Sequence, residues 1–291
     1  GTSTAFNGTG IAGATLTLED LALVGSINAG GTQALAAMRV DFSGASGTFV
    51  NALNGGIAIS DCTLDGNGVN SLTGNIAIAN STLTGDGVNS SGGALSLTNT
   101  AITGGGVNTS SGNISLTRLT ITGAPNDGVN SSTGAVTLVE SAVTNSGSSG
   151  VSTDSGALSL TRSLVSGSSG EGVRSSSGAI SVLNSTISGN ENGIFASTSV
   201  VTIDASTITL SQEEGIEGST PAITITNSIL AGNSPNCGVA ITSAQFTMSS
   251  DASCNLVGSG NRPSTNPLLG PLANNGGPTL THLPQPGSPA I

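Results

Sequence analysis

The chain has 291 residues, 44 of them glycine, with no lysine, tryptophan or tyrosine and a single histidine. Charged residues make up only 7% and the net charge is −11, so the five scattered arginines cannot track a phosphate backbone, and nucleic acid is excluded as a partner. No apolar run approaches the roughly 18 residues that a membrane-spanning helix needs, so no transmembrane segment is predicted.

The N-terminal part of the chain predicts irregular strands. Residues 1–15 indicate a short strand that ends in a turn, and residues 16–23 and 35–42 indicate two weak coils of the repeat that follows. From residue 57 a new strand begins after 19, 19, 19, 22, 22, 22, 21 and 22 residues. These first positions are Ile57, Ile76, Leu95, Ile114, Val136, Leu158, Ile180, Val201 and Ile223.

Three further apolar columns and one column of small residues share this period. The second begins Ile59, Ile78, Leu97; the third begins Leu64, Leu83, Ile102; the fourth begins Val69, Val88, Val107; and the small column begins Cys62, Ser81, Thr100. Apolar and polar residues alternate inside each run, as in strands, and glycines mark the corners. Three short strands in a period of 19–22 residues predict an all-β fold, a right-handed single-stranded parallel β-helix of about eleven coils with these columns inside.

The loops on one edge of the rod lengthen along the chain and gather acidic residues. The growth from 19 to 22 residues occurs between the third and fourth columns, and repeat proteins usually place contacts on such loops. Stacked coils would bring together Glu171, Glu191, Glu213, Glu214 and Glu217. Three interpretations stay open: a solvated acidic edge, a Ca²⁺ site, or carboxylates about 5 Å apart for glycoside hydrolysis. No other cofactor is expected.

A second surface signal is a rank of hydroxyl residues on the outward side of the second strand. Its members are Thr82, Thr84, Thr103, Thr120, Thr122, Thr144, Ser166, Thr186, Ser188, Thr207 and Thr209. The ranks resemble the flat faces of solenoid ice-binding proteins, which implies an interaction face. Threonine also suits any exposed strand, and Ala101, Ala142 and Leu164 interrupt the ranks, so both interpretations stay open.

The corner after the first strand predicts a ladder of polar side chains. Asn80 and Asn99 occupy this position in adjacent coils, and Arg118, Glu140 and Arg162 occupy it in the next three. Opposite charges one coil apart favour this alignment, although each exposed pair contributes only about 0–1 kcal/mol.

Residues 235–291 break the periodicity and contain eight of the ten prolines. An open coil end exposes unpaired backbone groups, so solenoids need a cap. We therefore expect residues 1–234 to form the rod and residues 235–291 a cap laid over the last coil. Cys237 and Cys254 lie close together in this region and predict a disulfide. Cys62 is expected in the core, and His282 is expected to be a structural residue of the cap.

The C-terminal motifs carry a family resemblance. Residues 266–282 (Asn-Pro-Leu-Leu-Gly-Pro-Leu-Ala-Asn-Asn-Gly-Gly-Pro-Thr-Leu-Thr-His), together with residues 286–291, 227–233 and 254–258, look like bacterial β-helix surface proteins of the choice-of-anchor Q type. Coils such as 184–190 are also similar to repeats of polymorphic outer-membrane proteins. The resemblance implies a right-handed parallel β-helix outside the cell or at its surface, with no established activity. The family usually continues into an anchoring tail, and this chain stops at Ile291.

We therefore expect a non-catalytic extracellular or cell-surface protein with a structural or adhesive role. The expected partners are surface polysaccharide, a host or neighbouring cell, and further copies of the chain. Residues 1–15 show no cap, so an open first coil would pair end to end with another copy and generate filaments, with Phe6 as the contact. The alternatives are a polysaccharide lyase or glycosidase at the acidic edge, and an ice- or ligand-binding solenoid that uses the threonine ranks.

Overall fold

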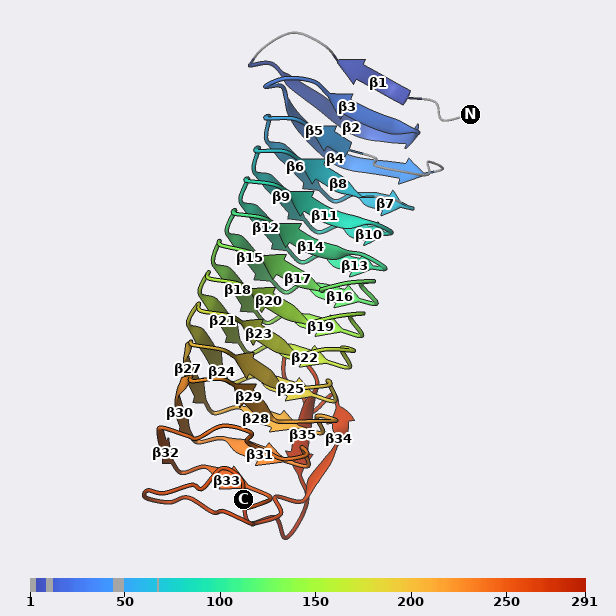
Figure 1. The fold of residues 1–291 in the computed structure, drawn as a ribbon. Helices are drawn as coiled ribbons and strands as arrows, with labels where there is room; N and C mark the ends of the chain where they lie inside the picture. Colours follow the sequence, from blue (N-terminus) through green and yellow to red (C-terminus); the bar gives the residue numbers. More distant parts are fainter. Residues whose placement is uncertain (1–3, 9–12, 44–49, 67) are drawn as a thin grey trace.

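Regular structure in this chain consists of short strands stacked along one axis. The structure is a computed structural model that describes residues 4–8, 13–43, 50–66 and 68–291, with the backbone alone for residues 4–8. All regular elements of that part are β-strands, and all but the last two form a parallel β-solenoid of about eleven coils (Figure 1). No helix in the described ranges is long and apolar enough to cross a membrane.

The third strands of the coils stack into one parallel sheet. Within the described residues this sheet has eleven strands, each paired with the strand one coil away. They are β1 (Thr4–Gly8), β3 (Ser26–Ala29), β5 (Val50–Ala52), β8 (Val69–Ser71), β11 (Gly87–Ser90), β14 (Gly106–Thr109), β17 (Val129–Ser131), β20 (Val151–Thr153), β23 (Val173–Ser175), β26 (Ile194–Ala196) and β29 (Ile216–Gly218).

The first and second strands together form the other parallel sheet, which has 22 strands in the part of the chain that the structure describes. The long strands β2 (Thr15–Val24) and β4 (Ala34–Ser43) span both positions. The remaining first strands are β6 (Ile57–Ser60), β9 (Ile76–Ala79), β12 (Leu95–Thr98), β15 (Ile114–Thr117), β18 (Val136–Val139), β21 (Leu158–Thr161), β24 (Ile180–Leu183), β27 (Val200–Asp204), β30 (Ala222–Thr226) and β32 (Ser243–Gln245). The second strands are β7 (Thr63–Asp65), β10 (Thr82–Thr84), β13 (Ala101–Thr103), β16 (Thr120–Thr122), β19 (Ala142–Thr144), β22 (Leu164–Ser166), β25 (Thr186–Ser188), β28 (Thr207–Thr209), β31 (Ile229–Ala231) and β33 (Met248–Ser249).

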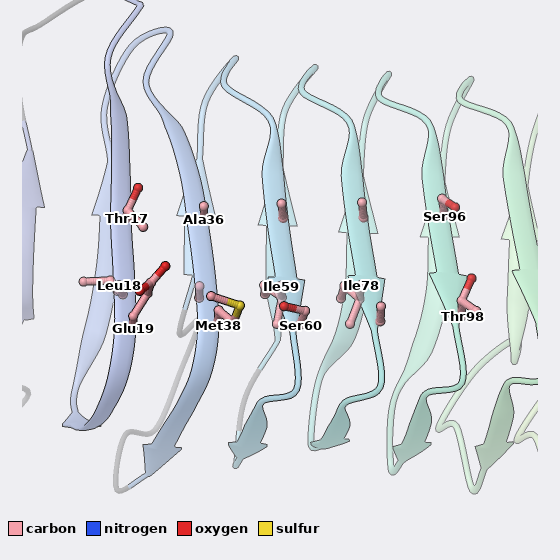
Figure 2. Close-up of a pocket in the computed structure, with 14 residues that line it drawn as sticks. Thr17, Leu18, Glu19, Ala36, Met38, Ile59, Ser60, Ile78, Ser96 and Thr98 are labelled. Atoms are coloured by element: carbon pink, nitrogen blue, oxygen red, sulfur yellow. The ribbon is translucent and has the colours of Figure 1, made fainter.

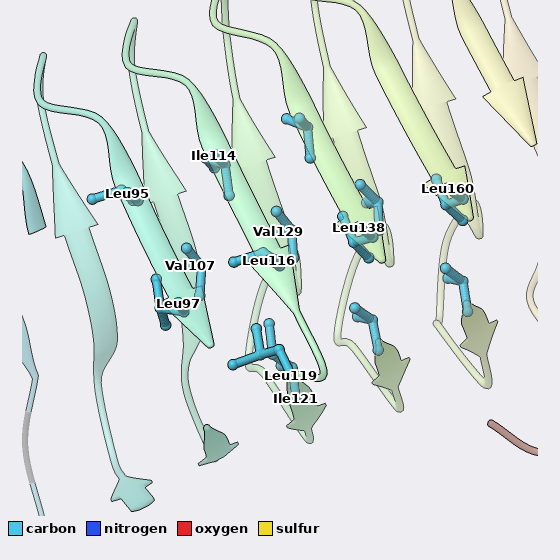
Figure 3. Packing of buried hydrophobic residues seen from close by; sticks show 14 of the residues in the cluster. Leu95, Leu97, Val107, Ile114, Leu116, Leu119, Ile121, Val129, Leu138 and Leu160 are labelled. Atoms are coloured by element: carbon cyan, nitrogen blue, oxygen red, sulfur yellow. The ribbon is translucent and has the colours of Figure 1, made fainter. Parts of the chain in front are cut away.

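The four predicted apolar columns form the core of the rod. Every member of these columns is at most 2% exposed. Strand register places each member beside its counterparts one coil away, as Ile76 lies between Ile57 and Leu95. Figure 3 shows this stacking for side chains such as Leu97 and Leu116. The predicted fold class, inward columns and register are confirmed.

The column of small residues forms the inner side of the corner between the first and second strands. The backbone N–H of Ser163 donates to the hydroxyl of Ser185 at 3.0 Å, and the N–H of Ser185 donates to the hydroxyl of Ser206 at 3.1 Å. Each hydroxyl also donates to a carbonyl of its own coil, as Ser185 does to Leu183 at 2.8 Å. A short hydroxyl side chain therefore satisfies buried backbone groups that an apolar residue would leave unpaired.

The parallel ladder runs past the boundary expected at residue 234. β32 pairs with β30 and β33 pairs with β31, and the buried Ala244 and Ser249 take the inward positions that Ile225 and Leu230 hold one coil earlier. The segment that follows covers this last coil. The N–H of Phe246 donates to the carbonyl of Ser259 at 3.0 Å, and the N–H of Ser249 donates to that of Arg262 at 3.1 Å.

The final part of the chain turns back along the side of the rod. β34 (Leu269–Ala273) and β35 (Thr281–Pro284) form an antiparallel hairpin, which Figure 1 shows alongside β25 and β28. The expectation of a cap laid wholly over the last coil therefore needs correction. Residues after β33 cover the last coil, whereas the hairpin covers the outward side of the second strands.

Candidate functional site

At the corner after the first strand, one residue in each successive coil adopts the left-handed backbone conformation. Its residue has φ between 47° and 54° at Asp20, Arg39, Asp61, Asn80, Asn99, Arg118, Glu140, Arg162, Asn184, Ala205, Asn227 and Phe246. Asparagine and aspartate tolerate this region better than other residues that carry a Cβ, which explains their frequency here. Sequence reasoning found the part of this column from residue 80 to residue 162. It missed Asp20 and Arg39 because the N-terminal coils lack the regular spacing, and it did not extend the column to Asp61 or beyond residue 162.

The side chains of this corner form a continuous ladder. Arg162 donates to Glu140 Oε1 from Nη2 at 2.9 Å, while Arg118 Nη1 lies 3.8 Å from Glu140 Oε2. Arg118 also donates from Nε to Asn99 Oδ1 at 2.5 Å, and Asn99 donates to Asn80 at 3.1 Å. The structure thus brings together the three residues of the expected charge ladder. They are exposed or half-exposed, so they favour the register more than they raise stability.

The pair Asp20 and Arg39 repeats this arrangement at the N-terminal end. Arg39 donates to both carboxylate oxygens of Asp20, at 2.5 and 2.8 Å. Hydrogen bonding to Arg39 lowers the pKa of the Asp20 carboxyl, while burial acts in the opposite direction. Arg39 thus binds the Asp20 carboxylate in a bidentate geometry.

Replacing Ala205 with glycine should stabilise the rod by about 1 kcal/mol, because alanine is strained at φ 47° and glycine is not. Urea unfolding measures the change. Ala58→Gly is the matched control, since Ala58 is an exposed strand residue without a left-handed backbone. At Ala58 glycine should lower the free energy of unfolding. If both variants changed this free energy in the same direction, the left-handed strain at Ala205 would not be its cause.

Four glutamates of the acidic edge lie on the turns that precede the third strands, and Glu217 lies within the third strand β29. The backbone of Glu213 donates to the carbonyl of Glu191 at 2.8 Å, so these two residues stack on adjacent coils as expected. Burial raises the pKa of the Glu217 carboxyl, and the charges of Glu214, Glu171, Glu213 and Glu191 raise it further. The other four glutamates thus lie within electrostatic range of Glu217. No group of three His, Cys, Asp or Glu residues in the described ranges is placed to hold a metal ion.

Two residues that the sequence did not assign complete this edge. Arg174 lies 3.6 Å from Glu171 and its guanidinium stacks over the ring of Phe195 at 5.4 Å. Asp127 accepts hydrogen bonds from the N–H of Ser149 at 3.0 Å and from the hydroxyl of Ser152 at 2.5 Å. Asp127 lies two residues before its fourth-column valine, as Glu171 does, and this spacing could have identified it.

Glu217→Gln is expected to raise stability at neutral pH. The pKa of Glu217 is raised above its ordinary value of 4.5 in the folded chain, so the folded state disfavours the charged form. Stability therefore falls as pH rises through the raised pKa, and the deficit persists above it. Thermal melts should show a higher melting temperature for the variant than for the parent at pH 7 and no difference at pH 4. The exposed Glu191→Gln is the control and should gain less; equal gains would contradict the assignment.

The rank of hydroxyl residues changes character along the rod. Thr82, Thr103 and Thr120 are exposed, and Thr84, Thr122 and Thr144 are half-buried. Beyond them the hairpin lies over the rank: Ser166, Thr186, Ser188 and Thr209 are buried, and Thr207 is half-buried. The expected interaction face over all of β10–β28 is therefore wrong in its C-terminal half, because the chain's own tail occupies it. An ice-binding face of that length is not available.

His282 fastens the hairpin to the rod. Its Nδ1 lies 2.7 Å from the carbonyl oxygen of Gly270 in β34, and its Nε2 lies 2.9 Å from the hydroxyl of Ser188 in β25. The side chain is 7% exposed. Its two hydrogen-bond partners are a backbone carbonyl and one serine, and these contacts fix the position of the hairpin on the rod.

The cysteines divide as one pair and one free thiol. A disulfide joins Cys237 to Cys254, whose Cα atoms lie 4.9 Å apart. Cys62 is buried in the corner column, and burial raises the pKa of its thiol. Phe6 belongs to β1, whose backbone pairs with β3, but its side chain lies outside the part that the structure describes.

Comparison with known proteins agrees with this geometry. The family model of the right-handed beta helix region matches residues 105–257. The chain belongs to that family. No curated protein matches this right-handed β-helix in sequence. One similar solved structure is the mannuronan C-5 epimerase A-module of Azotobacter vinelandii, with a TM-score of 0.45, 12% identity, and coverage of 85% of this chain and 87% of that one.

A shallow depression of about 450 Å³ lies on the outward side of the first strands of this β-helix. Figure 2 shows that it extends from Thr17 on β2 to Thr98 on β12, with Met38 between them. Small outward side chains such as Ala36 create it, because they leave the sheet uncovered. Its one carboxylate is Glu19, so it offers contact area with little polar chemistry.

Proposed function

We propose that this right-handed β-helix is a non-catalytic structural or adhesive protein at the cell surface or outside the cell, of the choice-of-anchor Q type. The observation that carries this proposal is the repetition of outward polar groups along the rod. Asn99 bonds to Asn80 at 3.1 Å and Arg162 bonds to Glu140 at 2.9 Å, each with the residue one coil away. Such a surface presents one kind of contact many times, which suits avidity toward an extended partner.

The proposed location rests on a second observation. Cys237 and Cys254 are bonded in a 27.8 kDa chain with one further cysteine, and disulfides persist mainly in exported proteins. Fractionation of the source cells, with protease treatment of intact cells, tests it. Recovery of the protein only from the soluble cell interior would contradict the location.

The structural or adhesive role is tested with purified protein and a panel of plant and bacterial polysaccharides. We expect co-sedimentation with a polymer or with cells, and no release of reducing ends, no unsaturated products and no change in sugar configuration. Any such product, formed at a rate proportional to protein concentration, would overturn the non-catalytic proposal.

The acidic edge supports the second candidate, a carbohydrate-active enzyme. Glu217 has a raised pKa, as a general acid requires, and it lies on β29 beside Phe195 of β26. If products appear in the panel, Glu217→Gln should abolish them while Glu191→Gln should retain them. Equal activity of both variants would place the chemistry elsewhere.

End-to-end assembly stays a prediction within the proposed function. At the C-terminal end, backbone groups of Phe246 and Ser249 are already paired with residues 259 and 262. Filament growth by strand pairing would first have to displace this segment. Light scattering and electron microscopy over a range of concentrations test it, and a strictly monomeric chain would contradict filaments.

A further inference from the structure

A second shallow depression, lined mainly by polar side chains, follows the left-handed corner in the N-terminal half of the rod. This corner groove, about 540 Å³ in volume, crosses three consecutive coils. One side is the corner ladder, and the other is the outward column of the second strands. Its rim residues are Asn80, Asn99 and Arg118 on the ladder side and Thr82, Ala101 and Thr120 on the strand side.

The ladder holds polar groups in fixed directions along the groove. Asn80 donates to Asp61 Oδ1 at 3.2 Å, Asn99 donates to Asn80 Oδ1 at 3.1 Å, and Arg118 donates to Asn99 Oδ1 at 2.5 Å. Each amide thus uses one N–H and one lone pair of its oxygen, and it keeps one donor and one acceptor for a ligand. Because neighbours already order these side chains, binding costs little side-chain entropy.

The groove repeats its chemistry at the spacing of the coils, about 4.8 Å. Thr82 and Thr120 add exposed hydroxyls for which no hydrogen bond is recorded among the described residues. A ligand that matches must also repeat donors and acceptors along its length. An extended glycan has this property, since its hydroxyls recur on each sugar unit.

Farther along the rod, the surface that continues the corner groove (called the track below) is covered by the tail of the chain itself. Thr279 donates its hydroxyl to the carbonyl of Arg162, a corner residue, at 3.5 Å, and three residues later His282 meets Ser188 at 2.9 Å. The tail therefore runs along the rod across successive coils, as Figure 1 shows for β35. An extended chain bound lengthwise on this side of the rod is thus present in the structure.

The uncovered part of the track differs from the covered part in a way that selects the ligand. Under the hairpin, the outward second-strand position holds the buried Leu164 as well as Thr186 and Thr207, so a peptide finds one large apolar contact there. In the corner groove the same column holds Thr82, Ala101 and Thr120. The groove therefore offers hydrogen bonds with little apolar area, and this favours a hydroxyl-rich chain over a peptide.

We propose that the corner groove binds an extended glycan chain that lies parallel to the rod axis, with sugar hydroxyls paired to the amides of Asn80 and Asn99. Arg118 closes one end and meets a sugar carboxylate where the glycan is acidic. This proposal deepens the adhesive function proposed above and rests on it.

The test is calorimetric or NMR titration of the whole chain with two hexasaccharide probes, a neutral β-1,4-glucan and a polyuronate. The variant Asn80→Gly/Asn99→Gly removes both amides and leaves the left-handed corners relaxed. Binding should weaken by at least about tenfold. Asn184→Gly, at the same corner outside the groove, is the matched control and should bind as the parent does. Arg118→Gln should weaken only the polyuronate.

The outcomes separate this proposal from the proposed function. If polymers or cells bind the parent and the double glycine variant equally, the groove is not the site, although the adhesive role stands. If neither hexasaccharide binds at all, the glycan assignment is overturned. Binding of a synthetic peptide of residues 266–291 in the groove, with no glycan bound, would overturn it in favour of a peptide ligand.

Discussion

Gly93→Ala is expected to destabilise the rod by about 3 kcal/mol. Gly93 lies in the turn between the third strand of one coil and the first strand of the next, and a Cβ added there would lie 1.9 Å from the carbonyl oxygen of Gly74. The obstacle is backbone of the adjacent coil, which cannot rotate away as a side chain can. Alanine would therefore have to push two coils apart and lengthen the ladder hydrogen bonds beside them.

The neighbouring Gly92 provides the control for this prediction. A Cβ at Gly92 would find its nearest atom at 3.7 Å, in ordinary van der Waals contact. Gly92→Ala should therefore change the free energy of unfolding by less than about 0.5 kcal/mol. Urea unfolding followed by circular dichroism measures both variants. Similar values for the two would show that coil spacing at this turn can relax, contrary to the argument.

The same close approach recurs along the rod. A Cβ would meet a glycine carbonyl of the preceding coil at 1.9 Å from Gly112, 2.0 Å from Gly134 and 1.8 Å from Gly178. The sequence shows glycine at these corners, but it does not distinguish a glycine needed for space from one needed for a left-handed turn. The distinction comes from the distance between coils, which only the assembled rod defines.

Most of the fold could be predicted from the sequence repeat. The columns that contain Ile76, Leu83 and Val88 recur every 19 to 22 residues, and every coil has the same inward positions, so strands, register and core can be predicted together. The charge ladder followed from the same alignment, because a residue and its counterpart one period later are neighbours in a solenoid. Asp20 and Arg39 escaped detection since their coils precede the regular spacing.

The return of the tail could not be inferred in this way. Ser188 and His282 are 94 residues apart, and His282 belongs to no repeat. Thr84 and Ser188 occupy equivalent positions in their coils, yet Thr84 is half-buried and Ser188 lies beneath the hairpin. The local sequence pattern of the second strands is the same in both cases. The sequence alone therefore does not distinguish the part of the rank that the hairpin covers from the part that stays exposed.

Replacing both Cys237 and Cys254 with alanine should lower the free energy of unfolding of the C-terminal end by about 3 kcal/mol. The bond closes a loop with a sequence separation of 17, and a loop of about this length loses that much entropy in the unfolded state. Both sulfurs are buried, with Cys237 5% and Cys254 2% exposed, so small residues fit the space best. In a solenoid each coil contacts only its neighbours, so the loss should stay local.

Hydrogen exchange tests that locality. Amides of Phe246, Ser249 and Arg262, which join the last coil to the segment covering it, should lose protection in the double variant. Amides of β9 and β12, in the middle of the rod, should keep theirs. Cys62→Ala is the matched control, since this thiol forms no disulfide, and it should leave exchange at the C-terminal end unchanged. Loss of protection along the whole rod would mean that the disulfide supports the solenoid as one cooperative unit. Unchanged exchange at all three amides would mean that hydrogen bonds such as Asn236 to Ser249, at 3.0 Å, hold this end without it.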